Sequence, residues 1–131
     1  MKFTTRQYRW LLVLYGIALT IATHWPDLSI QSPIIERPDL LLHGGCFGLL
    51  TLLIISARLV GKSADNSHNL FWGIVIAVAW SGLDELSQGI PAVHRHVAWS
   101  DFGANLLGVF ITGIGVWIFI LRKKVKRQAN N

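Results

Sequence analysis

Four long apolar stretches limit what this chain can fold into more than any other feature of its sequence. They run over residues 8–23, 40–57, 70–83 and 102–121. A helix needs about 20 residues, and at least about 17, to cross the hydrocarbon core of a bilayer. The second and fourth stretches reach that length alone, and the first and third reach it when polar residues at their ends are included. The sequence therefore predicts an all-α integral membrane bundle of four transmembrane helices.

The predicted spans cover about 8–24, 40–58, 69–88 and 101–121, with a basic tail at 122–131, in one domain of residues 1–131. Only 15% of the residues are charged, against roughly a quarter in soluble domains. A soluble bundle is the alternative, but its helices should carry a polar face, whereas Leu49–Ile55 and Ile74–Val78 are apolar nearly all round. The single cysteine, Cys46, excludes an intramolecular disulfide framework and a cysteine-based zinc site.

The first stretch could also be a signal peptide, because basic residues precede it and it is short. The sequence Ile21-Ala22-Thr23 before His24 is a poor match to the small-x-small cleavage pattern. We therefore expect this segment to remain as a span.

The basic residues predict the orientation of the spans. All but two of the twelve Lys and Arg lie in segments 1–9, 58–69 and 122–131, and the two exceptions are Arg37 and Arg95. The positive-inside rule therefore predicts that both termini are cytoplasmic. Because the basic clusters flank apolar stretches, the net charge of +5 points to a bilayer with anionic headgroups as the partner and not to nucleic acid. We expect a cytoplasmic (inner) membrane as the location, and the oligomeric state stays open.

Polar residues gather where three predicted helices meet the outer face of the membrane. They recur at helical spacing of three or four, so members of each group share a helix face. The candidate ligand-binding residues are Asp39, His43, Asp84, Glu85, Gln88, Arg95, Asp101 and Asn105. Ionisable groups at membrane depth cost about 2.5 to 3.5 kcal/mol near the helix centre, so they usually face the bundle interior and pair with one another. The neighbours Asp84 and Glu85 are about 100° apart on a helix and must point in different directions.

Three other readings of this cluster remain open. Asp39, and Ser100 or Asp101, could simply cap the N-termini of helices. The whole set could be a salt-bridge network that only joins helices. The oxygen ligands and His43 could also suit a divalent cation such as Mg²⁺ or Mn²⁺, but no recognised metal motif appears, and we expect no metal and no cofactor.

Small residues also recur at helical spacing in two predicted spans. Gly44 and Gly48 are four residues apart, as are Ala104 and Gly108. Faces of this kind let helix backbones approach closely in lipid, so the spacing predicts helix packing.

The ordered set Asp39-x-x-x-His43, Glu85-x-x-Gln88, Arg95, Asp101-x-x-x-Asn105 and Gly108 resembles the VanZ-like family of small bacterial membrane proteins. The resemblance covers roughly residues 39–108, and Leu40 stands where the family commonly has lysine. It implies a multi-span helical membrane protein, and the founding member is linked to resistance to the glycopeptide antibiotic teicoplanin. A family does not by itself fix a function.

We therefore expect an outward-facing polar pocket that binds a lipid or cell-envelope headgroup and influences the envelope or the glycopeptide response. Arg95 would contact an anion, while His43, Glu85 and Asp101 would orient the ligand or handle protons. The alternatives are a membrane enzyme acting on a lipid-linked substrate, with Glu85 or His43 as general base, and a structural or partner-binding membrane protein. The sequence leaves open whether the protein is an enzyme, and the catalytic residues stay unknown.

Overall fold

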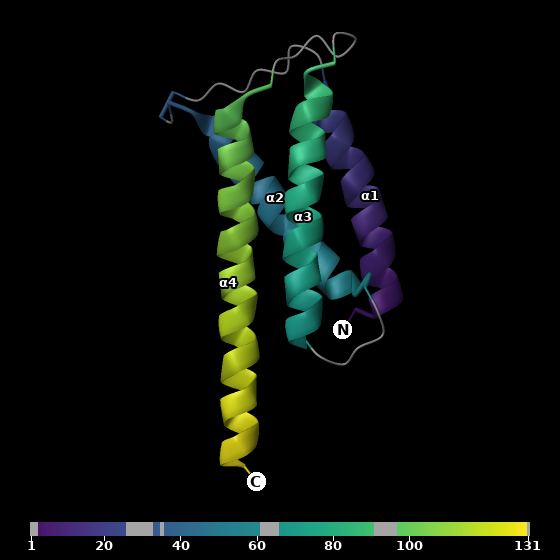
Figure 1. Cartoon of the computed structure of the whole chain (residues 1–131), viewed down its shortest axis with the longest axis vertical. Helices are drawn as coiled ribbons and strands as arrows, with labels where there is room; N and C mark the ends of the chain where they lie inside the picture. Colours follow the sequence, from purple (N-terminus) through teal and green to yellow (C-terminus); the bar gives the residue numbers. More distant parts are fainter. Residues whose placement is uncertain (1–2, 26–32, 35, 61–65, 91–96, 131) are drawn as a thin grey trace.

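The computed structural model describes residues 3–25, 33–34, 36–60, 66–90 and 97–130. Within these ranges the chain is helical, with α1 at Thr5–Thr23, α2 at Pro38–Ala57, α3 at Asn66–Gln88 and α4 at Trp99–Ala129 (Figure 1). The helices begin two or three residues before the predicted spans. The fourth helix continues eight residues past its predicted span, through the basic tail.

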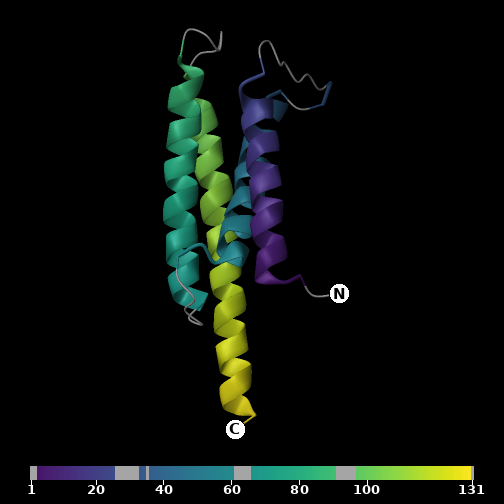
Figure 2. The same cartoon turned by 90° about the vertical axis from the view of Figure 1, so that its right-hand side faces the viewer.

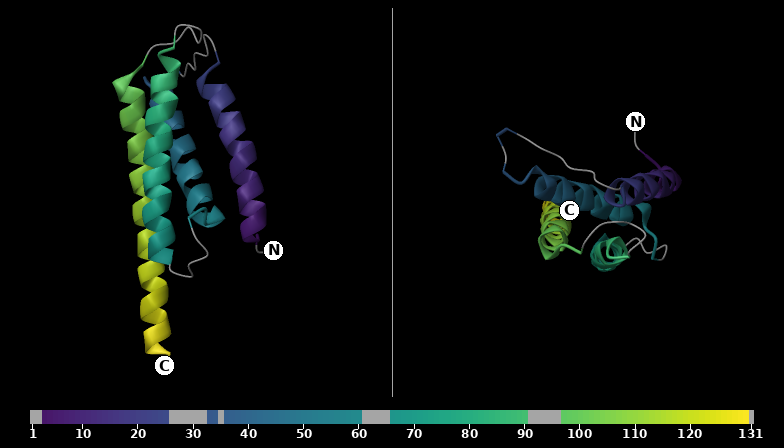
Figure 3. Two further views of the ribbon diagram at one scale, coloured as in Figure 1. Left: turned by 45° about the vertical axis from the view of Figure 1, so that its right-hand side comes forward. Right: turned by 90° about the horizontal axis from the view of Figure 1, so that it is seen from above.

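The end of α1, the start of α2, the end of α3 and the start of α4 lie at one end of the bundle, the upper end in Figure 1. We call this end the polar end. The helix α2 packs against each of the other three helices, whereas α1 meets α3 over only a few residues. Figure 2 shows α2 between α1 and the pair α3 and α4, and the view from above in Figure 3 agrees. The topology therefore collects the polar helix ends on one side.

Three helices in the described part of the chain, α2, α3 and α4, are long and apolar enough to cross a membrane. The helix α1, which carries Arg6 and Arg9 near its start, is not among them. Large apolar side chains remain exposed along the bundle, as at Leu83 (69%) and Ile111 (68%). Soluble monomers rarely expose large contiguous apolar patches, and acyl chains solvate such side chains in a bilayer. These features describe a helical membrane protein.

The closest packing in the bundle joins α2 to α4 through small residues. The position of a Cβ at Gly44 would lie 3.2 Å from the Ala104 carbonyl oxygen, and one at Gly48 would lie 3.3 Å from that of Gly108. A Cβ at Gly108 would overlap the Gly44 carbonyl group. The predicted packing role of these small residues is confirmed, because only residues without large side chains let the two backbones approach this closely.

The helix α1 is attached to α2 by apolar and polar contacts. Leu12 and Leu19 are buried in the core that α1 shares with the other helices. Tyr15 Oη donates a hydrogen bond of 2.9 Å to the Cys46 carbonyl oxygen. The guanidinium of Arg9 donates to the carbonyl oxygens of Ala57 and Arg58 at 3.0 and 3.1 Å, where the end of α2 leaves backbone acceptors unsatisfied. These contacts make α1 part of the bundle.

Candidate functional site

The described candidate residues all lie at the polar end. Glu85 contacts the start of α4, and the other residues form three groups with different surroundings. One group joins α2 to α4, one joins α1 to α3, and one lies at the exposed rim. Glu85 lies within electrostatic range of Asp101, His43 and Asp84, so the buried groups belong to one neighbourhood.

The first group is centred on His43, which lies one turn inside α2. Its Nδ1 is 3.1 Å from Asn105 Oδ1, and its Nε2 is 3.5 Å from Asp101 Oδ2. Asp101 and Asn105 are four residues apart on α4 and therefore present both groups to the same imidazole. With a proton on each ring nitrogen, His43 would donate to both residues and pair its charge with Asp101. Both ring nitrogens already have a partner in this arrangement.

The second group is centred on Asp84, whose side chain is almost completely buried. Thr23 Oγ1 on α1 donates to Asp84 Oδ1 at 2.9 Å, and Gln88 Nε2 donates to Asp84 Oδ2 at 3.0 Å. His24 Nδ1 lies 3.8 Å from Asp84 Oδ1, and His24 Nε2 lies 2.8 Å from Ser87 Oγ. Each carboxylate oxygen therefore has a partner, and the group ties the end of α1 to the end of α3.

Glu85 points away from its neighbour, towards α4. Its Oε1 accepts a hydrogen bond from the backbone N–H of Ala98, the N-cap residue of α4. The N-cap residues of α2 and α4, Arg37 and Ala98, make no side-chain cap hydrogen bond within the described residues. The possibility that Ser100 or Asp101 caps α4 is therefore wrong, because the helix begins at Trp99 and places both of them in its first turn.

Three buried polar atoms at this level have no hydrogen-bond partner in the described part of the chain. They are Ser81 Oγ, Glu85 Oε2 and Asn105 Nδ2, on side chains that are 0%, 2% and 0% exposed. Buried polar groups in folded proteins nearly always have a partner, and an unpaired one costs about 1–3 kcal/mol. These atoms therefore require an explanation beyond helix packing.

The register of α3 and α4 spreads these three residues over nearly two helical turns at the polar end. Glu85 meets Ala98, and a Cβ at Gly82 would lie 3.9 Å from the Phe102 ring. Because the two helices run antiparallel, each step back along α3 corresponds to a step forward along α4. Ser81 is thus about level with Phe102 or Gly103, one turn below Glu85, and Asn105 lies two or three residues deeper along α4.

The third group lies at the rim of the site and is half-exposed. Arg37 Nη2 lies 2.9 Å from Asp39 Oδ2, 3.7 Å from Asp101 Oδ1 and 3.4 Å from Ser100 Oγ. The hydrogen bond from Arg37 to Asp39, followed by the charge of Asp39, raises the pKa of Arg37 above its ordinary value, so this side chain remains a cation. Asp39 does not enter the buried group around His43, because it turns outward to this arginine.

Arg95 lies outside the described residues, as do the flanking residues His94 and His96. Among the described residues, the buried acids of the site are Asp84, Glu85 and Asp101. No three His, Cys, Asp or Glu side chains in the described ranges are grouped so that they could hold a metal ion.

Three residues of the site, Thr23, His24 and Arg37, were not predicted from the sequence. Thr23 and His24 end the first apolar stretch, and a polar pair at a predicted span end was the available signal. Arg37 was noticed only as one of two basic residues outside the cytoplasmic segments. Such a cation in a segment that the positive-inside rule otherwise keeps free of cations was the signal for a local acidic partner.

The fold and the site define the class of protein: a helical membrane protein with a buried polar cluster at one end of its bundle. Comparison with family models, with curated proteins and with solved structures finds no match to the chain. The function must therefore be argued from the geometry of the site.

Proposed function

We propose that this chain is a four-span protein of the bacterial cytoplasmic membrane, with both termini in the cytoplasm and the polar end facing outward. The distribution of basic residues supports this orientation. The structure of α1 is compatible with a fourth span, since it runs beside α2 to the polar end (Figure 3). The basic turns of α4 would then extend into the anionic cytoplasmic surface.

We further propose that the buried site at the polar end binds the polar headgroup of a lipid or of a lipid-linked envelope component. The observation that carries this proposal is the set of three buried atoms, Ser81 Oγ, Glu85 Oε2 and Asn105 Nδ2, that have no partner within the described residues. A network that only joined helices would gain by pairing these atoms, because each unpaired group costs free energy inside a membrane. A ligand that pairs them removes that cost.

The chemistry of the three atoms indicates the kind of headgroup. The Glu85 carboxylate oxygen accepts, so it favours a hydroxyl or ammonium donor, and the Asn105 amide donates, so it favours an oxygen acceptor. The Ser81 hydroxyl can do either. A headgroup rich in hydroxyl groups, or one that carries an amine beside an oxygen, satisfies this pattern. Arg95 would add an anion contact if the loop that carries it covers the site.

The resemblance to VanZ-like proteins connects this proposal to the cell envelope. It is carried by His43, Glu85, Asp101 and Asn105 among others, and these are residues of the buried site. We propose that binding at this site influences the envelope or the response to a glycopeptide antibiotic, with teicoplanin as the probe.

The test compares Glu85→Gln and Arg95→Ala with the wild-type protein. Lipids retained by each purified protein are identified by mass spectrometry, and cells that produce each protein are assayed for teicoplanin susceptibility. We expect both variants to lose the lipid that the wild type retains and to respond differently to the drug. Glu36→Gln, at an exposed acid outside the cluster, is the matched control and should retain the lipid. Unchanged lipid and drug response in both variants, at normal protein abundance, would reject the proposal.

The second candidate is a purely structural role, which the fully paired Asp84 group favours. Under that hypothesis Glu85→Gln should lower abundance and thermal stability as much as it lowers any phenotype. An enzyme that uses His43 as general base is less favoured, because both ring nitrogens already have partners at 3.1 and 3.5 Å.

A further inference from the structure

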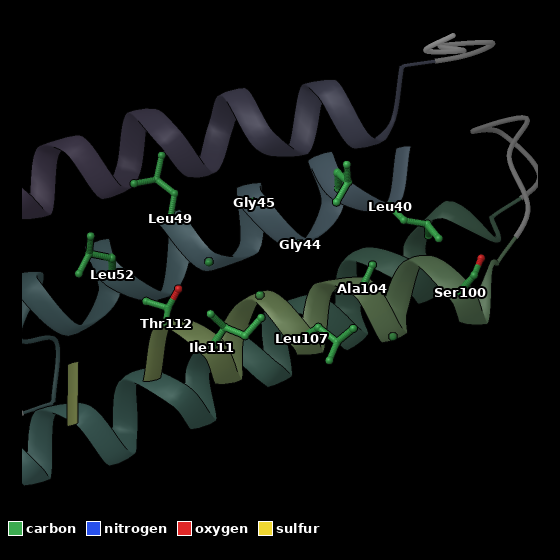
Figure 4. Close-up of a pocket in the computed structure, with 14 residues that line it drawn as sticks. Leu40, Gly44, Gly45, Leu49, Leu52, Ser100, Ala104, Leu107, Ile111 and Thr112 are labelled. Carbon is green, nitrogen blue, oxygen red and sulfur yellow. The ribbon is translucent and has the colours of Figure 1, made fainter. Parts of the chain in front are cut away.

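We infer that the groove between α2 and α4 holds one acyl chain of a phosphatidylethanolamine-type lipid in the outer leaflet. The groove has a volume of about 1000 Å³ and is lined by both helices (Figure 4). This inference goes beyond the proposed function to a second lipid site, and it rests on the proposed function only for the orientation of the bundle.

Glycine packing creates the groove. Gly44, Gly48 and Gly108 bring the two backbones together. Because glycine has no side chain, the surface over this line of contact is hollow, and this hollow is the groove. Leucines and Ile111 form its walls, as Figure 4 shows for Leu49, Leu52 and Leu107. Its surface is therefore apolar along its length and faces the lipid side of the bundle.

The length of the groove matches one leaflet. It runs from Leu40 to Leu52 on α2 and from Ser100 to Thr112 on α4. At 1.5 Å per residue, twelve residues span about 18 Å, and half of a hydrocarbon core is about 15 Å. The groove thus begins at the helix ends and stops near the middle of the bilayer. A groove of this length accommodates one acyl chain of a single leaflet.

Charged groups at the open end of the groove complement a zwitterionic headgroup. Ser100 lines that end, and its hydroxyl lies 3.4 Å from Arg37 Nη2. The Arg37 side chain is 52% exposed and that of Asp39 is 37% exposed, so both can meet a headgroup. A phosphate would pair with the guanidinium and an ammonium with the carboxylate, which matches phosphatidylethanolamine in the signs of its two charges.

The test uses the full chain in nanodiscs that contain a phosphatidylethanolamine with a diazirine in the middle of one acyl chain. After illumination, cross-linked residues are mapped by proteolysis and mass spectrometry. We expect cross-links concentrated on the groove walls, at Leu49, Leu52, Leu107 and Ile111. Even labelling over all lipid-facing sides of the helices would overturn the inference.

Substitutions that fill the groove sharpen the test. A Cβ at Gly103 would meet nothing within 4 Å, and Gly103 lines the groove, so Gly103→Leu should block the acyl chain without disturbing the helix contact. Gly45→Leu is a second variant, which should block the groove from α2, because Gly45 lines the groove and a Cβ there also meets nothing within 4 Å. Gly115→Leu is the matched control, because a Cβ there also meets nothing within 4 Å and Gly115 does not line the groove. We expect several-fold less groove labelling in the two filled variants and unchanged labelling in the control.

A diacylglycerol with the same photoactivatable chain tests the headgroup contacts. The wild type should label more strongly with the phosphatidylethanolamine probe, and Arg37→Gln should abolish that preference. Equal labelling by the two probes in the wild type would overturn the assignment of the lipid class. In a separate experiment with a bifunctional protein cross-linker, links between two protein copies that Gly103→Leu removes would also overturn the inference, since a second copy would then fill the groove.

The two proposals can fail separately. Glu85→Gln should leave groove labelling unchanged, because Glu85 does not line the groove. If groove labelling is retained while Glu85→Gln and Arg95→Ala have no effect on retained lipid or drug response, only the headgroup proposal fails. If those variants have their expected effects but labelling is even, only the acyl-chain inference fails.

Discussion

The carboxylate of Glu85 accepts a hydrogen bond from the backbone N–H of Ala98, so the last turn of α3 holds the residue that precedes α4. No side chain of α4 itself caps this helix within the described residues. A carboxylate near a helix N-terminus is also favoured by the helix dipole. One oxygen of Glu85 thus has a structural partner, and the other is the buried acceptor of the candidate site.

Replacing Glu85 should separate these two roles. Glu85→Ala leaves the Ala98 N–H without its acceptor and should lower the free energy of unfolding by about 1–3 kcal/mol. Glu85→Gln keeps an amide oxygen for that bond and should retain most of the stability. Thermal unfolding of the purified proteins in one detergent checks this. Equal loss of stability in the two variants would contradict the assigned hydrogen bond.

Asp84 should matter for stability more than any exposed acid. Asp84→Ala removes the acceptor of both Thr23 and Gln88 and should lower the free energy of unfolding by about 1–3 kcal/mol. Asp39→Ala, the control, breaks a half-exposed ion pair with Arg37 and should cost about 1 kcal/mol or less. Chemical unfolding of both variants in the same detergent measures the difference. The pairing of α1 with α3 through Asp84 would be refuted by equal effects.

The contact between α2 and α4 should not tolerate even one added methyl group at its closest point. Gly108→Ala would force the new Cβ into the Gly44 carbonyl and should cost about 1–3 kcal/mol through overpacking. Gly115→Ala adds the same atom to the same helix where nothing lies within 4 Å, so its stability should be unchanged or slightly higher. The melting temperatures of the two variants check this prediction, and a stable Gly108→Ala protein would speak against the packing described.

The hydrogen bond between His43 and Asn105 should appear as a coupling energy. Double-mutant cycles on interhelical hydrogen bonds in membranes average about 0.6 kcal/mol, with a maximum of about 1.7 kcal/mol. We expect a value in this range for His43→Ala combined with Asn105→Ala, from unfolding of the wild type, both single variants and the double variant. A coupling of zero would show that the two residues do not interact.

The proposed orientation predicts which cysteines a membrane-impermeant maleimide reaches. In a Cys46→Ala background, Ala92→Cys should be labelled in intact cells, because the proposed orientation puts the segment between α3 and α4 outside the cytoplasm. Asn130→Cys, in the basic tail, should be labelled only after the cells are permeabilised. The reverse pattern would place the polar end in the cytoplasm and would end the headgroup proposal.

The helices and the end at which the polar residues meet follow from local sequence. An apolar segment of spanning length forms an α-helix in a bilayer, because every backbone N–H and C=O must then be paired within the segment. Residues four apart, such as Asp101 and Asn105, must then share a face of their helix. The small-residue spacing likewise predicted close helix packing at these faces, but it did not show that α2 and α4 would be the partners.

The pairing of the side chains was decided only by the tertiary structure. The sequence shows that Asp84 and Glu85 must diverge, but not that Asp84 meets Thr23 while Glu85 meets Ala98. Nor does it show that Asp39 turns to Arg37, or that a leaflet-long groove lies over the α2–α4 contact. These outcomes depend on the rotation of each helix about its axis and on its height against its neighbours. Both quantities come from packing between segments that are some sixty residues apart, such as Thr23 and Asp84, and no local pattern encodes them.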